Sequence, residues 1–301
     1  MDLSRLRRFA LARPHVLLVQ ACGGRDVRWA AESRLACAGW PLASSPADAD
    51  VLLICGRPGP ELERALHNVW EAMPGPRVRR TCPHERQIDR VLATACAELG
   101  DVTGQRRDAA ARGALADMGG DLDGGLSMAG SAGDRDGLAL DALHLSLGPV
   151  LPGWPAGLVL DVVLQGDVLQ EVIARVLDAE PEPSAPPAAV ALDLLARLLR
   201  AAGASTAALR VLRARDSGDM EGVRLPRLLR WSLRGLPAPD GLDLSDYPGR
   251  LVQAARTAAP LPAVGIADLE AALVGLEVGS AGLVVAAYGP RLGVREVAAH
   301  G

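Results

Sequence analysis

The stretch Asp50-Val-Leu-Leu-Ile-Cys-Gly56 is a continuous apolar run that ends at a glycine. A short run of this kind is typical of a strand buried on both faces of a parallel sheet. Upstream, His15-Val-Leu-Leu-Val-Gln-Ala-Cys22 has the same character and is followed by Gly23-Gly24. Downstream, Arg77–Arg80 predicts a third and shorter strand.

Segments with helical patterns separate and follow these strands. They are Arg25–Ala38, Pro60–Met73 and Pro83–Leu99, the last with a proline early and Gly100 just past its end. Strands that alternate with helices indicate an α/β fold. We expect a flavodoxin-like, doubly wound parallel sheet with helices on both faces.

The length of 301 residues favours more than one domain, since a single core stops growing at roughly 250–300 residues. We expect an α/β domain over residues 1–100 and a glycine-rich linker over 101–136. A small β-hairpin element follows over 137–180, in which Gly166-Asp167 joins strands Gly157–Gln165 and Val168–Ile173.

A proline-rich linker, Pro181–Pro187, precedes a mainly helical region over 188–301. Its expected helices contain Leu192–Leu199, Ala207–Ala214, Leu225–Leu233 and Asp268–Leu276. The apolar run Leu283–Ala287 is interpreted as a strand.

Composition argues against several classes of protein. The formal net charge is -4 and the sequence pI ≈ 5.8, so no overall positive field would attract nucleic acid. The motifs of P-loop, Rossmann and G-x-S-x-G proteins are missing. The most apolar helical stretch, Ala188–Leu199, is interrupted by Asp193 and Arg197, and a span needs roughly 20 apolar residues. With no signal-peptide pattern, we expect a cytoplasmic protein without a transmembrane segment.

One motif connects the second strand with the helix that follows it. Ser44-Ser45-Pro46-Ala47-Asp48-Ala49-Asp50 leads into the strand, and the helix ends in Val69-Trp70-Glu71-Ala72-Met73-Pro74-Gly75-Pro76-Arg77. Together with the first strand, this order resembles the NuoB/PSST-type small subunit of complex I and of nickel–iron hydrogenases over Pro14–Cys82. In that family an "SPRxAD" turn precedes a buried strand, and a Tyr or Trp stands shortly before "MPxP".

The resemblance implies a 4Fe-4S cluster site, of which only remnants are present. Family members use an adjacent cysteine pair after the first strand, a third cysteine after the "MPxP" strand and a fourth in a "GCPP" loop. Cys22 falls at the start of the pair, but Gly23 follows it, and Cys82 falls near the third position. A cubane needs four thiolates or near equivalents. Cys22 and Cys82 are thus candidate remnant ligands, with His84 as an alternative third donor for a cluster or for zinc.

The other cysteines have a simpler interpretation. Cys37 and Cys55 stand in apolar settings and are expected to be small buried hydrophobic residues. No two of the five cysteines form C-x-x-C, and their odd number argues against a disulfide framework.

A second resemblance follows the glycine-rich segment. Leu143-His-Leu-Ser-Leu-Gly-Pro-Val-Leu-Pro152, continuing through the hairpin, is similar to the N-terminal β-element of the NuoD-type large subunit. There, a "GPxHPxxHG" loop supplies histidines to a quinone site. Here Leu151 stands in the place of the first histidine and Trp154-Pro155-Ala156 covers the second. The quinone-site histidines are therefore mostly lost, unless His144 supplies the hydrogen bond that leucine cannot.

Three functional hypotheses follow. The first is a non-catalytic accessory or structural subunit of a complex-I-like or hydrogenase-like redox assembly. It would have no cofactor and would bind other subunits, membrane-embedded ones among them, at the cytoplasmic face of the membrane. The second is an electron-transfer subunit that holds a 4Fe-4S cluster with help from a partner chain or His84. The third is a binding module whose strand ends, near Gly23-Gly24 and Gly56-Arg57, hold a small ligand.

Overall fold

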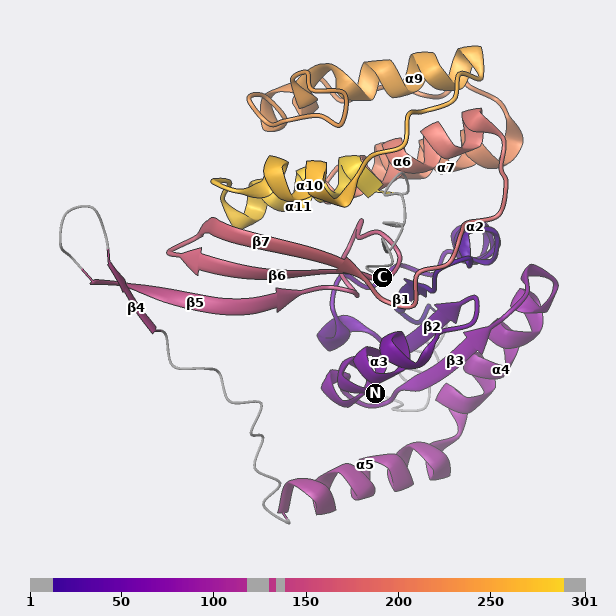
Figure 1. Cartoon of the computed structure of the whole chain (residues 1–301). Coiled ribbons are helices and arrows are strands. Elements are labelled where there is room, and N and C mark those ends of the chain that lie inside the picture. Colours follow the sequence, from indigo (N-terminus) through magenta and orange to yellow (C-terminus); the bar gives the residue numbers. More distant parts are fainter. Residues whose placement is uncertain (1–12, 118–129, 134–138, 290–301) are drawn as a thin grey trace, which may run out of the picture. The chain divides into compact units, whose positions relative to one another are not determined.

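The computed structural model describes residues 13–117, 130–133 and 139–289 (Figure 1). Contacts divide the chain into two compact units. The first comprises Met1–Leu126 together with Glu180–Pro183, and the second comprises Ser127–Ala179 and Ser184–Gly301.

A parallel sheet forms the centre of the first unit. Its strands are β1 (Val16–Gln20), β2 (Val51–Cys55) and β3 (Val78–Cys82), hydrogen-bonded in the order β1-β2-β3. All five residues of β2 are buried, as expected for a central strand covered on both faces. The α/β fold predicted for this region is confirmed.

Among its described residues, the same unit contains four α-helices: α2 (Arg25–Ala38), α3 (Pro60–Ala72), α4 (Ile88–Gly100) and α5 (Val102–Asp117). The bounds of α2 agree with the prediction because a glycine stands at each end. Gly39 has a φ of 68°, the left-handed conformation that ends a helix. The region expected to be one helix from Pro83 instead holds a 3-10 turn, Glu85–Gln87, before α4 begins.

Alternation along β2 assigns the helices to the two faces of the sheet. Val51, Leu53 and Cys55 pack in one cluster with buried residues of α2 and α4. Leu52 and Ile54, which alternate with them, are buried on the opposite face. The buried side of α3, formed by Leu62 and Leu66, is not part of the α2–α4 cluster, which is consistent with α3 covering that face.

The expected linker of residues 101–136 is wrong over Val102–Asp117, which form α5. The glycines of this segment lower its helix propensity and led to the prediction of a linker, but tertiary contacts stabilise the helix. The Gln105 side chain bonds both the N–H (2.9 Å) and the C=O (3.1 Å) of Arg77, and Asp108 pairs with the Arg77 guanidinium at 3.2 Å. Most of the remaining predicted linker, residues 118–129 and 134–136, lies outside the described residues.

An antiparallel sheet lies in the second unit. Its strands are β4 (Gly130–Gly133), β5 (Ala139–Leu147), β6 (Leu158–Gln165) and β7 (Val168–Val176), in that order. The predicted hairpin is confirmed as β6–β7, with Gly166 at a φ of 63° in its turn. The pairing of β5 along β6 was not predicted.

The remainder of the second unit is mainly helical, as predicted. The helices are α6 (Pro187–Ala201), α7 (Ser205–Ser217), α8 (Leu229–Ser232), α9 (Tyr247–Thr257), α10 (Ile266–Leu273) and α11 (Val278–Tyr288). The strand predicted at Leu283–Ala287 is wrong, because these residues lie within α11. A short buried apolar run does not distinguish a strand from a buried helix. The helix expected over Leu225–Leu233 is reduced to α8, and α9 was not predicted.

One hydrophobic core joins the sheet and helices of this unit. Residues of β6 and β7 pack in the same cluster as α6, α7, α9, α10 and α11. Helix α6 is buried continuously from Ala191 to Leu199, and α10 contacts β7, where Glu270 accepts a hydrogen bond from the Ala174 N–H at 2.7 Å (Figure 1). Among the helices of the described residues, none has the length and apolar character needed to cross a bilayer.

Candidate functional site

The strongest candidate site is the edge of the parallel sheet at which its strands end. Gln20, Cys55 and Cys82 are register partners there, each the last residue of its strand. The carboxyl ends of parallel strands are the usual position of ligand sites in α/β proteins. Both candidate ligands, Cys22 and Cys82, therefore come from this edge.

Two backbones approach closely beside Cys22. A Cβ placed on Gly24 would lie 2.2 Å from the carbonyl oxygen of Cys55, and one placed on Gly56 would lie 2.9 Å from the Gly24 Cα. Glycine is thus required at both positions for the turns after β1 and β2 to pack together.

A distant acidic residue lies at this turn. Glu182 accepts hydrogen bonds from Gln20 Nε2 at 2.5 Å and from the backbone N–H of Arg25 at 3.1 Å. Arg25 is the first residue of α2, and the amino end of a helix favours a negative charge. The carboxylate of Glu182 occupies the position that an anionic ligand of this helix would need. We call Glu180–Pro183, which carries it, the strap.

Polar contacts continue from the strap beneath α2. Gln20 Oε1 accepts a hydrogen bond from Arg28 Nε at 2.6 Å, and Arg28 pairs with Glu32 at 2.9 Å. Arg28 and Glu32 are both nearly fully buried. A continuous series of contacts therefore joins Glu182, Gln20, Arg28 and Glu32, so the buried charges in it are paired as they must be.

The predicted ligands do not fit a 4Fe-4S cluster. Cys22 follows β1 and Cys82 ends β3, with β2 between these strands. His84 contacts Arg57 through Nε2 at 3.2 Å, and the Cys82 thiol donates to the His84 carbonyl oxygen at 3.3 Å. Two thiols supply half of the donors that a cubane needs. In the parts of the chain that the structure describes, no three His, Cys, Asp or Glu side chains are grouped to hold a metal ion.

Burial also keeps the two thiols at the strand ends protonated. It raises the pKa of Cys55 and the pKa of Cys82, because a low-dielectric environment disfavours a thiolate. Cys55 is fully buried, as predicted, but Cys37 is exposed on α2, so the expectation for Cys37 is wrong.

The residues of the second resemblance do not converge. His144 is exposed on β5 and Leu151 is exposed after it. Trp154 donates from Nε1 to the Leu158 carbonyl oxygen at 2.6 Å and accepts at its own carbonyl from Arg197 at 2.8 Å. These contacts account for the loop without a quinone.

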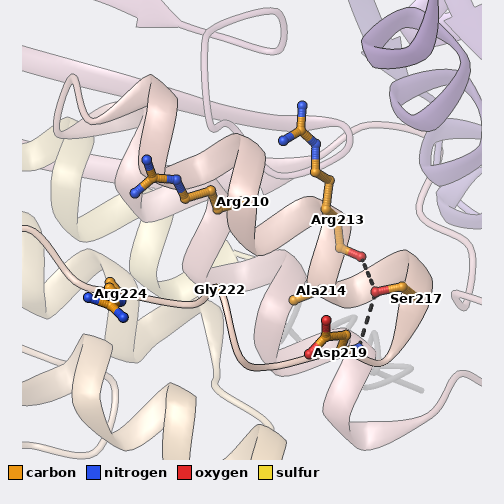
Figure 2. Close-up of a pocket in the computed structure, with 7 residues that line it drawn as sticks. All are labelled: Arg210, Arg213, Ala214, Ser217, Asp219, Gly222 and Arg224. Carbon is orange, nitrogen blue, oxygen red and sulfur yellow. Dashed lines mark hydrogen bonds between the residues drawn. The ribbon is translucent and has the colours of Figure 1, made fainter.

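A basic recess in the second unit was not predicted from the sequence. Figure 2 shows Arg210 and Arg213 projecting from α7, with Arg224 opposite them on the following loop. The recess has a volume of about 510 Å³, and Asp219 is the acidic residue that lines it. In the described chain, none of the three arginines forms an ion pair. All 32 basic residues of the chain are arginine, so a group of three arginines is not a distinctive signal in this sequence.

Comparisons with protein-family models, with curated proteins and with solved structures found no match to this chain. The two resemblances therefore stay predictions. Glu182 could not be found from sequence, since it stands in a proline-rich segment with no motif around it.

Proposed function

We propose that this chain is a non-catalytic accessory subunit of a complex-I-like or hydrogenase-like redox assembly, with a degenerate iron–sulfur site. The observation that supports the proposal most is the carboxylate of Glu182, which is hydrogen-bonded to Gln20 and Arg25 on either side of the turn that contains Cys22. The resemblance would put the cluster in the same place.

Electrostatics favours this interpretation over electron transfer. A cubane with thiolate ligands is itself anionic, so a carboxylate fixed beside it would raise the cost of binding and of reduction. The turns after β1 and β2 pack closely through Gly24 and Gly56, whereas the donor set is incomplete. Such a combination is expected when a scaffold keeps its shape for assembly and no longer carries electrons.

The partners in this proposal are other subunits of the assembly, and the location is the cytoplasmic face of a membrane. A tagged chain isolated from its native source should then copurify, in fixed ratio, with subunits that themselves contain iron–sulfur clusters. Quantitative mass spectrometry measures that ratio. A monomer without any redox partner would contradict the proposal.

The cofactor content is tested separately. Protein isolated without oxygen should contain far less than one cluster equivalent of iron and sulfide and should give no cluster signal in paramagnetic resonance after reduction. A stoichiometric cluster that is lost in Cys22→Ser/Cys82→Ser but retained in Cys37→Ser would establish the electron-transfer alternative instead.

A further inference from the structure

The segment Arg224-Leu-Pro-Arg-Leu-Leu-Arg-Trp-Ser-Leu-Arg234 carries four arginines, and no acidic residue occurs from Gly222 to Pro239. The whole chain has a formal net charge of -4. This segment, which we call the basic segment, is therefore a local concentration of arginine on an acidic protein. Two carboxylates lie against it, Asp243 near Arg234 and Asp246 at Arg230, so they offset part of its charge and leave Arg224 and Arg227 without an ion pair among the described residues.

The basic segment has two apolar sides with different environments. Leu229 and Leu233 are buried in the core of the second unit and fix the segment there. Leu228 and Trp231, in contrast, are 76% and 73% exposed, and Leu225 is also exposed. Large apolar side chains that stand in water beside a fixed backbone indicate a contact surface.

Arginines accompany each exposed apolar residue. An arginine comes directly before each of them, in the pairs Arg224-Leu225, Arg227-Leu228 and Arg230-Trp231. Arg234 ends the segment. Arg230 pairs with Asp246 at 2.8 Å, but both side chains are exposed, so the pair holds the guanidinium weakly.

The recess of Figure 2 extends this positive region. Arg224 lines the recess together with Arg210 and Arg213. Apart from the buried Arg215, six arginines thus lie along the chain between the start of α7 and Arg234.

The small exposed apolar surface of the basic segment favours a lipid surface over a protein as its partner. A stable protein interface buries about 800 Å² on each side around an apolar core, whereas the exposed apolar side chains of this segment, Leu225, Leu228 and Trp231, are too few to form such a core. An anionic bilayer requires only that a few apolar side chains enter the headgroup region while basic residues meet the phosphates. Tryptophan favours that interface, and arginine reaches it with its apolar stem buried.

We infer that the basic segment, with the arginines of the recess, is a peripheral docking surface for a bilayer that contains anionic lipids. The inference does not depend on the proposed role in a redox assembly. It requires only the exposure and the charge of this segment.

The test uses the purified full chain and vesicles of phosphatidylcholine, with and without phosphatidylglycerol. The chain should sediment with the anionic vesicles and not with the neutral ones, and added salt should release it. Arg227→Gln/Arg234→Gln should weaken binding roughly thirtyfold, at about one kcal/mol for each arginine near the surface. The matched control Arg86→Gln/Arg90→Gln, which changes two exposed arginines of the first unit, should bind as the unmodified chain does.

The apolar contribution has its own readout. Tryptophan emission should shift to the blue on anionic vesicles, and Trp231→Ala should remove this shift and weaken binding. Ile173→Ala, at an exposed apolar position of β7, should change neither. Equal binding to neutral vesicles, equal loss in the two arginine pairs, or binding to polyglutamate without binding to anionic vesicles would overturn the inference.

Discussion

The Glu182 carboxylate accepts a hydrogen bond of 2.5 Å from the Gln20 side chain, 162 positions away in the sequence. Through this bond and the one from the Arg25 N–H, a segment far along the chain becomes part of the first unit. The strap is therefore a tertiary element of the α/β unit as well as a connection.

Replacing Glu182 with Ala should release the strap. The Arg25 N–H would lose its acceptor and the helix its terminal charge, at a local cost of about 1–2 kcal/mol. Hydrogen exchange of a peptide over residues 21–30 should become faster. Glu180→Gln is the matched control, because the Glu180 carboxylate lies near Gly23, 3.4 Å from where a Cβ on that residue would stand, and forms no hydrogen bond with the turn in the described part of the chain. Equal acceleration in both variants would show that the Glu182 bonds are not what holds the strap.

Asp193 is the shared counter-ion of two buried arginines in the second unit. It pairs with Arg215 at 3.1 Å and with Arg197 at 3.3 Å. Asp193→Asn would remove the negative charge that these two buried guanidinium groups share, and we expect unfolding of this unit to require about 3–5 kcal/mol less. Asp216→Asn, which removes a more exposed partner of Arg215, should cost below about 1 kcal/mol. Urea denaturation followed by hydrogen exchange of α6 measures both, and similar values would contradict the assignment.

Arg77 joins three elements of the first unit. Its guanidinium lies 4.1 Å from the Trp70 ring centroid, pairs with Asp108 of α5, and donates to the Trp70 and Met73 carbonyl oxygens. Lysine cannot make this planar set of contacts. Arg77→Lys should destabilise the docking of α5 by about 2–4 kcal/mol, seen as faster exchange of α5 amides. Arg79→Lys, in an exposed pair with Glu63, should leave α5 protected.

Asp48 provides a test by pH. Burial raises its pKa, but hydrogen bonds from the backbone and side chains of Ser44 and Ser45 outweigh this and lower it from 3.8 to about 2. A carboxylate whose pKa is lower in the folded state than in the unfolded state stabilises the fold at pH values above the unfolded-state pKa. This contribution is lost as the pH falls from about 4 to about 2. Asp48→Ala should therefore cost about 1 kcal/mol at neutral pH, and its difference from the unmodified chain should shrink in acid. A difference independent of pH would contradict this origin.

Thiol reactivity tests the burial of the strand ends. Cys37 is exposed, whereas Cys55 and Cys82 are buried with raised pKa values. Because thiolates are the reactive form, iodoacetamide should modify Cys37 first and should reach Cys55 and Cys82 only on unfolding. Mass spectrometry of timed samples gives the order. Early modification of Cys82 would support an accessible ligand there.

Local signals explain which elements could be predicted from the sequence. Gly24 and Gly39 mark both ends of α2, and the continuous apolar run of β2 has one simple interpretation. Leu283–Ala287 is equally apolar, but helix and strand are not distinguished by such a run when all sides are buried. Helix α5 depends on Gln105 and Arg77, a contact that no local pattern contains.

The position of the candidate site could be predicted from the sequence, but the carboxylate that lies in it could not. Cys22 and Cys82 do end up at one edge of the sheet, because parallel strands align their carboxyl ends. The Glu182 carboxylate comes from more than 150 positions away, as its separation of 157 from Arg25 shows. Contacts over such separations depend on the complete fold, so the occupied anion position was found only in the structure.

Gly23 makes it difficult for this site to regain the adjacent cysteine pair in evolution. Its φ of 73° is left-handed, and a Cβ there would stand 3.4 Å from the Glu180 carboxylate. Gly23→Cys, the single change that would recreate the adjacent cysteine pair, would strain the backbone, because a residue with a Cβ rarely adopts this left-handed conformation. A lineage with this turn must first change the backbone conformation at residue 23 before it can regain the pair without strain, so the order in which substitutions are accepted becomes constrained.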